Sequence, residues 1–283
     1  MRIVLAWTAL FSACMVALSL AGEAESTANG PRSVRVAAIQ FDAVPEAVDD
    51  NLDHMERLAR QAAKQGARWI VFHEGTVCDY TDDLDRFAEL VPQGKSTQRM
   101  MAVAKSLGCF ISFGLSEKDE QQHFYITQVF VGPEGLVYRY RKTWLCKSPG
   151  DRGFRNEHAR YDPGSGPELF TIDGVRATCY ICSDGSARRC IQRASRLRPE
   201  IVFYPVNICA KERAWFRDQA KAHALAIGAP VILANRVGDS WVHQGGVGGA
   251  AIFSADGEML AAANCEGKEE IILADVPLGR NDR

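Results

Sequence analysis

The sequence has no marked excess of charge of either sign. Its 283 residues include 33 lysines and arginines against 35 aspartates and glutamates, a formal net charge of -2. Proteins that bind nucleic acid through its phosphates carry a basic excess, so this balance argues against a nucleic-acid partner. The sequence also lacks a long basic run that would mark a membrane surface. It shows no repeat of fixed period.

One long apolar run is present, and it lies at the start of the chain. Met1-Arg2 precedes the apolar stretch Ile3–Ala21, and small residues surround Ala21–Ala24. This order predicts a secretory signal peptide over residues 1–24 and a spacer over residues 25–33. We therefore expect a secreted or periplasmic protein with no stable membrane partner after cleavage. An uncleaved anchor is the alternative, because the run is about long enough to span a bilayer.

The rest of the composition is that of a soluble globular protein. Hydrophobic residues make up 47% of the chain and charged residues 24%, which supports a sizeable core. Nine cysteines are present, and Cys14 falls in the signal segment. The other eight are irregularly spaced, so they predict no particular disulfide framework. If one of these eight is a catalytic thiol, at least one more is unpaired.

Short apolar runs and helical periodicities alternate along the chain. A strand, a helix and a strand over residues 34–41, 51–66 and 68–73 favour parallel pairing. Turn signals predict three hairpins, at 124–132 with 135–141, 168–172 with 175–182, and 250–254 with 259–262. Further helices are expected at 96–107, 186–197 and 214–227, and further strands at 109–115, 201–205, 230–234 and 271–276. This mixture predicts a single α/β domain with mixed sheets over residues 34–276 and a tail over 277–283.

Three ionisable residues stand where predicted strands end: Glu74, Lys142 and Cys182. Sites in α/β proteins form at the carboxyl ends of buried strands. A cysteine becomes nucleophilic when a base or a cation helps to form its thiolate. The three residues therefore predict nucleophilic catalysis, in which Glu74 takes the thiol proton and Lys142 stabilises the thiolate and a later oxyanion.

Three motifs in this order resemble those of the nitrilase superfamily, the carbon–nitrogen hydrolases. They are the strand Ile70–Glu74, the segment Tyr140–Thr143, and Ile181–Asp184 after Gly174. Glu157, which precedes Pro163-Gly164, matches the family's second glutamate. The segments Ala234–Arg236 and Phe253–Gly257 fit a later strand and hairpin. The resemblance spans about Val34–Val276.

The resemblance implies a four-layer α-β-β-α sandwich and a role for each matched residue. Cys182 would be the nucleophile, Glu74 the general base, and Lys142 the oxyanion stabiliser. Glu157 would be a positioning carboxylate or a second base, and the backbone N–H of Ser183 would also bind the oxyanion.

Members of this family hydrolyse nonpeptide carbon–nitrogen bonds. The expected reaction is amidase-like and passes through a thioester, without a metal or cofactor. The expected partners are a small amide, carbamoyl or nitrile substrate and further copies of the chain, in a homodimer or larger homo-oligomer.

Four positions depart from the usual family pattern. Ser183 stands where Tyr is common, and Gly185-Ser186-Ala187 replaces an aromatic-Pro-Glu turn. His223 stands where Arg is common, and Gly249-Ala250-Ala251 lacks the usual Ser. The first three changes leave the catalytic set intact and leave substrate binding open. In the 143–156 loop, Arg152 and Arg155 could bind a substrate carboxylate or could simply be solvated.

Several other interpretations stay open from the sequence. The same cysteine could serve a nitrilase, and the fold could also carry a catalytically silent binding protein. Cys179 and Cys182 form a C-x-x-C that would suit a thiol–disulfide oxidoreductase, although residues three apart in a strand point to opposite faces. His73, Cys78 and Asp79 could be proposed as metal ligands but lack a second strong pair. A Cys182–His223 dyad is a further alternative.

Overall fold

The first of two large sheets combines parallel and antiparallel strands. In the computed structural model, which describes residues 32–147, 156–208, 213–239, 246–264 and 267–279, this sheet has six strands. Their order is β14 (Glu270–Pro277), β1 (Ser33–Gln40), β2 (Trp69–Val71), β3 (Phe110–Lys118), β4 (Phe124–Gly132) and β5 (Gly135–Arg141). β1, β2 and β3 are parallel, as the strand–helix–strand pattern predicts, and the outer pairs are antiparallel.

The second sheet has the same number of strands and the same kind of pairing. Its order is β13 (Met259–Ala262), β12 (Ala251–Phe253), β9 (Val231–Ala234), β8 (Ile201–Pro205), β7 (Val175–Cys179) and β6 (Phe170–Ile172). Strands β7, β8 and β9 are parallel, and the outer pairs are antiparallel. A separate short ribbon joins β10 (Val237–Gly238) and β11 (Gly246–Val247).

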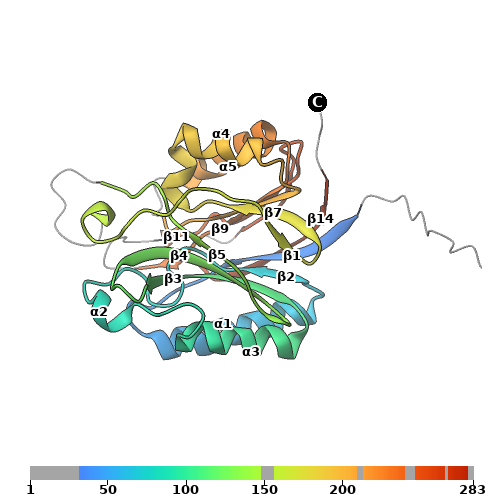
Figure 1. The fold of residues 1–283 in the computed structure, drawn as a ribbon. Helices are drawn as coiled ribbons and strands as arrows, with labels where there is room; N and C mark the ends of the chain where they lie inside the picture. The colour runs from blue at the N-terminus through green and yellow to red at the C-terminus, as the bar shows by residue number, and fades with distance from the viewer. Residues whose placement is uncertain (1–31, 148–155, 209–212, 240–245, 265–266, 280–283) are drawn as a thin grey trace, which may run out of the picture. The chain divides into compact units, whose positions relative to one another are not determined.

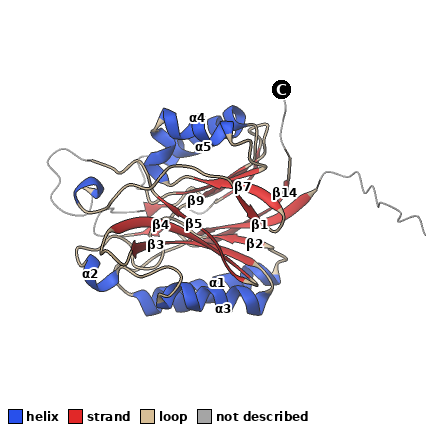
Figure 2. Cartoon of the chain, viewed as in Figure 1, coloured by secondary structure: helices blue, strands red, loops and turns tan. Residues whose placement is uncertain are grey.

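Helices cover the outer face of each sheet (Figures 1 and 2). α1 (Val48–Lys64) and α3 (Lys95–Leu107) lie on the first sheet, and α4 (Arg188–Arg196) and α5 (Arg213–Ile227) lie on the second. α1 is amphipathic, and the residues that it buries include Leu52, Met55, Leu58, Ala59 and Ala62. The predicted four-layer α-β-β-α sandwich is therefore confirmed.

Aromatic side chains hold the inner faces of the two sheets together. The ring of Phe203 on β8 lies 5.0 Å from that of Phe130 on β4 and 5.9 Å from that of Trp69 on β2. Phe170 on β6 lies 4.8 Å from Phe130. Such buried aromatics contribute much of a core's stability. Because the sheets pack face to face, the residues that follow their strands can meet in one interior.

The nucleophile segment departs from the predicted strand. The run predicted over residues 175–182 stops as a strand at Cys179, and Cys182–Ser186 form the 3-10 turn η2. The Asp184 side chain accepts a hydrogen bond from the Ile181 N–H, so the backbone there leaves the strand ladder. The short helix α2 (Leu84–Phe87), the 3-10 turn η1 (Glu157–Ala159) and the β10–β11 ribbon were also not predicted.

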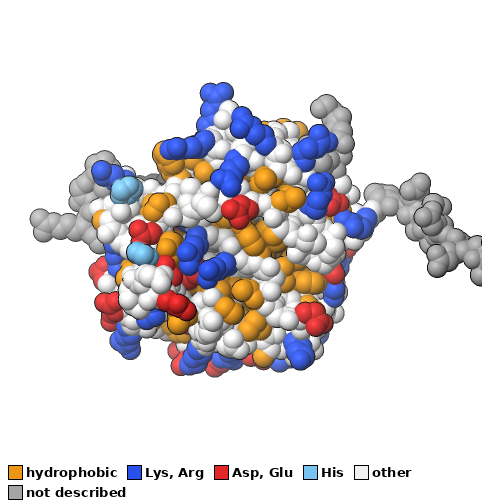
Figure 3. All heavy atoms as spheres, in the orientation of Figure 1, with side chains coloured by type: hydrophobic (Ala, Val, Ile, Leu, Met, Phe, Trp, Pro, Cys, Tyr) orange, Lys and Arg blue, Asp and Glu red, His pale blue; other side chains and the backbone are white. Residues whose placement is uncertain are grey.

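α4, on the outer face of the second sheet, exposes a group of arginines. Figure 3 shows lysine and arginine side chains gathered on this side of the molecule. Arg188, Arg189, Arg193 and Arg196 are exposed on α4. Two of them are engaged within the chain: Arg189 lies over the Trp144 ring, and Arg193 donates to the Ser165 carbonyl.

The predicted signal peptide, residues 1–24, lies outside the described residues, as does the spacer except for Arg32 and Ser33. Within the described part of the chain, no helix combines the length and the apolar character needed to cross a bilayer.

Candidate active site

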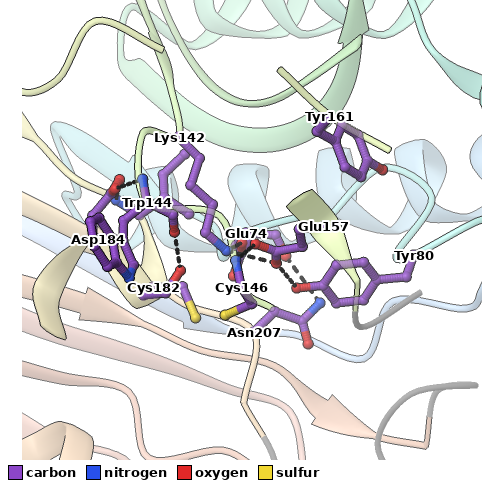
Figure 4. Close-up of polar contacts among 12 residues, drawn as sticks. Glu74, Tyr80, Lys142, Trp144, Cys146, Glu157, Tyr161, Cys182, Asp184 and Asn207 are labelled. Carbon is purple, nitrogen blue, oxygen red and sulfur yellow. Dashed lines mark hydrogen bonds and ion pairs between the residues drawn. The ribbon is translucent and has the colours of Figure 1, made fainter. Parts of the chain in front are cut away.

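The three predicted strand-end residues meet between the two sheets. Lys142 directly follows β5, Glu74 lies three residues after β2, and Cys182 lies three residues after β7 in the other sheet. Figure 4 shows their side chains directed toward one interior region. The facing sheets cover all three side chains and leave Glu74 1% and Cys182 7% exposed.

Lys142 is fixed between two buried carboxylates. Its Nζ lies 2.7 Å from Glu74 Oε1 and 2.8 Å from Glu157 Oε1, and its side chain is fully buried. Burial alone disfavours the ammonium, but the Glu157 and Glu74 carboxylates raise the pKa of Lys142 well above its usual range. The lysine is therefore a permanent cation whose position is set from two sides.

Glu157 accepts hydrogen bonds from three donors. Its Oε1 accepts from Lys142 Nζ and from the Tyr80 hydroxyl at 3.1 Å, and its Oε2 accepts from the Cys146 backbone N–H at 2.8 Å. A carboxylate held by three donors is poorly placed to abstract a proton from substrate or water. Of the two roles left open by the sequence, positioning is the one that this geometry favours.

Glu74 is the carboxylate with spare acceptor capacity. Its Oε2 is buried without a hydrogen-bond partner among the described residues. Burial raises the pKa of Glu74 to about 7, with Lys142 opposing this shift and the Glu157 charge adding to it. A carboxyl whose pKa lies near neutrality can both take and return a proton at physiological pH. These properties match the predicted general base.

Cys182 occupies a strained backbone position at the start of η2. Its φ is 46°, in the left-handed region that residues other than glycine rarely adopt. Burial and the Glu74 charge raise the pKa of the thiol well above its usual value, although Lys142 lowers it. A raised pKa favours the neutral thiol, which needs a base to take its proton during attack.

Asp184 connects the nucleophile turn to the segment after Lys142. Its carboxylate accepts from the backbone N–H groups of Ile181, Thr143 and Trp144, at 3.0, 3.1 and 2.6 Å. The hydroxyl of Ser183 donates to the Trp144 carbonyl at 2.5 Å. Sequence reasoning assigned no role to Asp184, although its place in the motif next to Cys182 was a signal.

Tyr80, Asn207 and the Cys146 backbone N–H were also missed. Tyr80 and Cys146 contact Glu157, as described above. Asn207 Nδ2 lies 3.4 Å from the Glu74 carbonyl and 2.8 Å from Asp79 Oδ1. These residues come from loops without periodic patterning, so no local sequence signal placed them here.

The C-x-x-C pair is not oxidised in this structure. Cys179 and Cys182 are both free. Cys179 is fully buried in the core, and burial raises the pKa of its thiol well above the usual value. A cysteine buried in this way contributes to core packing.

Two of the suggested metal ligands, Asp79 and His73, interact with other protein groups. Asp79 binds Asn207 and also forms a buried ion pair with Arg236 at 3.0 Å. The His73 ring contacts the Glu74 carbonyl at 2.6 Å. Burial and the Arg236 charge lower the pKa of His73 to about 3. Across the described ranges, no group of three His, Cys, Asp or Glu side chains is arranged to hold a metal ion.

His223 and the loop arginines complete the predicted candidates. His223 Nδ1 lies 3.0 Å from the Tyr180 hydroxyl, and burial lowers the pKa of His223 to about 4. It is packed between Tyr180 and Tyr204, not arranged in a dyad with Cys182. Arg152 and Arg155 lie outside the described residues.

A small cavity and a larger groove lie near this region among the described residues. A small one of about 10 Å³, room for a single water, borders Glu74, Tyr80 and Asn207. A larger groove of about 280 Å³ runs along β5 and residues 163–168. The larger groove is lined by none of Glu74, Lys142, Glu157 and Cys182, so its size does not make it the reaction site.

Comparisons with known proteins agree with this geometry. The nitrilase of Pyrococcus abyssi is 27% identical over 250 residues, covering 87% of this chain and 90% of the relative. The omega-amidase NIT2 of Xenopus tropicalis is 28% identical over 250 residues, covering 86% and 88%. The crystal structure of a carbon-nitrogen hydrolase from Helicobacter pylori superposes with a TM-score of 0.77 at 20% identity, covering 87% of this chain and 90% of that one.

The family assignment follows from a match over almost the whole described fold. The sequence model of the carbon-nitrogen hydrolases matches residues 35–282, which include β1 through β14 apart from the first residues of β1. The buried Glu–Lys–Cys set lies within this match, on the residues where the family motifs predicted it. The chain belongs to the carbon–nitrogen hydrolase family, and the protein is a hydrolase of the amidase and nitrilase type.

Proposed function

We propose that the protein is an amidase-like hydrolase that cleaves a small nonpeptide amide through a thioester on Cys182. The observation that carries this proposal is the Lys142 ammonium, held 2.7 Å from Glu74 Oε1 and 2.8 Å from Glu157 Oε1 beside the Cys182 turn. A fixed cation next to a nucleophile can stabilise the negative oxygen that forms when a carbonyl is attacked.

The first half of the reaction forms the thioester. Cys182 Sγ attacks the amide carbon while its proton passes to the Glu74 carboxylate. The carbonyl oxygen becomes an oxyanion, which the Lys142 ammonium and the Ser183 backbone N–H stabilise. The carbon–nitrogen bond then breaks, Glu74 returns its proton to the nitrogen, and the amine or ammonia leaves.

The second half releases the acid. Glu74, again a carboxylate, takes a proton from water as the water oxygen attacks the thioester carbon. The carbon–sulfur bond breaks, and the proton on Glu74 returns to the Cys182 sulfur. The pKa of about 7 for Glu74 suits a group that takes up and returns a proton twice in each turnover.

The test is hydrolysis by the Cys182→Ala variant. A panel of amides, N-carbamoyl compounds and nitriles is assayed for release of ammonia and acid. The variant should fold and lose all activity, because the sulfur that forms the thioester has been removed. The Cys109→Ala variant, which removes a buried thiol between the end of α3 and the start of β3, should retain activity. Hydrolysis retained by Cys182→Ala would refute the proposal.

Two other functions are separated by the same experiment. A nitrilase would use the same thiol and would turn over nitriles in the panel but not amides. A silent binding protein would hydrolyse nothing, and Cys182 would then show no selective alkylation by iodoacetamide. The buried cation and the near-neutral base favour a working hydrolase, since both are costly to keep in a core without a function.

Export and assembly are further parts of this proposal. The signal-like segment at residues 1–24 supports secretion or transfer to a periplasm, and the mass of the protein isolated from the exported fraction would test cleavage. The family resemblance supports a homodimer or larger homo-oligomer, which sedimentation would test.

A further inference from the structure

One fully buried carboxylate, that of Asp184, accepts hydrogen bonds from four N–H and O–H donors, and the Cys190 thiol is a fifth, longer donor to Oδ1 at 3.9 Å. Oδ1 accepts from the backbone N–H of Thr143 and of Trp144. Oδ2 accepts from the backbone N–H of Ile181 at 3.0 Å and from the Tyr140 hydroxyl at 2.8 Å. Hydrogen bonds to a charged acceptor are about twice as strong as neutral ones, so this cluster is a strong connection.

The four N–H and O–H donors belong to two segments that come from different sheets. Tyr140 lies on β5, and Thr143 and Trp144 directly follow Lys142. Ile181 directly precedes Cys182. Asp184 thus joins the segment that carries the cation to the turn that carries the nucleophile. The Ser183 hydroxyl makes a weaker second link between the same segments through the Trp144 carbonyl.

The nucleophile needs such support because its backbone is strained. A left-handed conformation is unfavourable for a residue with a Cβ and persists only where its surroundings enforce it. The Ile181 N–H bond to Asp184 spans Cys182 and closes the turn around it. The Tyr204 hydroxyl supports the same turn from β8, 3.1 Å from the Cys182 carbonyl.

We infer that Asp184 is a positioning residue for the reaction, which fixes the Cys182 sulfur relative to the Lys142 ammonium by tying the two segments together. Asp184 itself contacts neither substrate nor reacting atom. The inference rests on the proposed function, because it matters only if Cys182 and Lys142 act on the same carbonyl.

The test compares the Asp184→Asn variant with the full-length wild-type protein. Asparagine keeps the shape but replaces one accepting oxygen by an NH₂ donor, so two of the four donors lose their acceptor. A misplacement of about 1 Å can cost about 100-fold in rate. We expect kcat to fall by roughly 10- to 100-fold, with KM changed by less than about threefold, on the amide that the wild type hydrolyses.

Two further measurements separate positioning from a merely structural role. Thermal unfolding and titration of reactive Cys182 give the folded, competent fraction, to which kcat is normalised. The rate of Cys182 alkylation by iodoacetamide, read by peptide mass spectrometry, should also fall, and this readout requires no hydrolysis. The exposed Asp85 on α2 supplies the control, and Asp85→Asn should match the wild type in every measurement.

The outcomes are distinct. If the wild type hydrolyses the amide, and Asp184→Asn matches it in normalised kcat and in alkylation rate, the inference about Asp184 is overturned and the proposed function stands. Absence of wild-type hydrolysis would overturn the proposed function, and the alkylation rate would still decide the inference. If Asp184→Asn does not fold, Tyr140→Phe takes its place, since it removes a single donor. A loss in kcat of roughly 3- to 10-fold would support the inference, and no loss would overturn it.

Discussion

Replacing Glu157 by glutamine should shift the pH dependence of the reaction toward acid. The Glu157 charge is one of the causes that raise the pKa of Glu74 to about 7. In the wild type, Glu74 must lose its proton before it can act as a base, so activity should rise with pH through about 7. With Glu157→Gln, the Glu74 carboxylate no longer faces a second negative charge. Its pKa falls, and the rise in activity moves to lower pH.

The size of the shift follows from two distances. Glu74 and Glu157 accept from the same Lys142 Nζ at 2.7 and 2.8 Å, so their accepting oxygens are at most 5.5 Å apart. At an effective dielectric constant of about 20, two unit charges at that separation repel by about 3 kcal/mol. One pH unit corresponds to about 1.4 kcal/mol. The expected displacement, after relaxation of Lys142, is therefore roughly one to two pH units.

Alkylation by iodoacetamide measures this shift without knowledge of the natural substrate. The alkylation rate at Cys182 is followed from pH 4 to 9. Peptide mass spectrometry distinguishes the Cys182 adduct from an adduct on the half-buried Cys146. Glu134→Gln, an exposed change in the β4–β5 turn, is the matched control and should leave the profile in place. A profile of Glu157→Gln that coincides with the wild type, or moves to higher pH, would refute the electrostatic coupling of the two carboxylates.

Three further changes test other parts of the site. Lys142→Met should abolish at least about 99% of kcat, measured by turnover. It should also lower the unfolding free energy by about 3–5 kcal/mol, measured by urea titration, because two buried carboxylates lose their cation. Gly185→Ala should destabilise the protein by about 1–3 kcal/mol, since a Cβ there would lie 2.4 Å from the Tyr204 hydroxyl; an unchanged melting temperature would contradict this. The pKa of His73 falls from 6.5 to about 3 on folding, so the stability that its neutral form provides is present above pH 6.5 and lost as pH falls toward 3. In His73→Gln the free energy of unfolding should change less steeply with pH over that window, by up to the slope that the uptake of one proton produces.

Sequence patterns predicted the elements and the central catalytic residues because both leave local signals. Helical spacing located α1, α3 and α5, and turn residues located the three hairpins. Glu74, Lys142 and Cys182 could be found because each follows a strand and sits in a family motif. Their meeting place depends on how two sheets pack, and the family resemblance supplied that expectation.

The remaining features depend on contacts between distant segments. Tyr80 binds Glu157 across 77 residues of sequence, and Asn207 reaches Asp79 across 128. No periodic pattern marks such pairs. The burial that raises the pKa of Glu74 and of Cys182 has the same origin, since it comes from the covering sheet. The early end of β7 was missed because Asp184 accepts from the backbone just before Cys182, which propensity alone does not indicate.

The pairing of β14 with β1 also constrains how the chain can fold. Arg35 and Asp275 face each other in register although 240 residues separate them. During synthesis, the edge of β1 stays open until residues 270–277 have been made, and open strand edges invite aggregation. Contacts of such long range also slow folding. A ribosome-bound chain that ends before β14 should therefore need a chaperone, and the first sheet should be completed last.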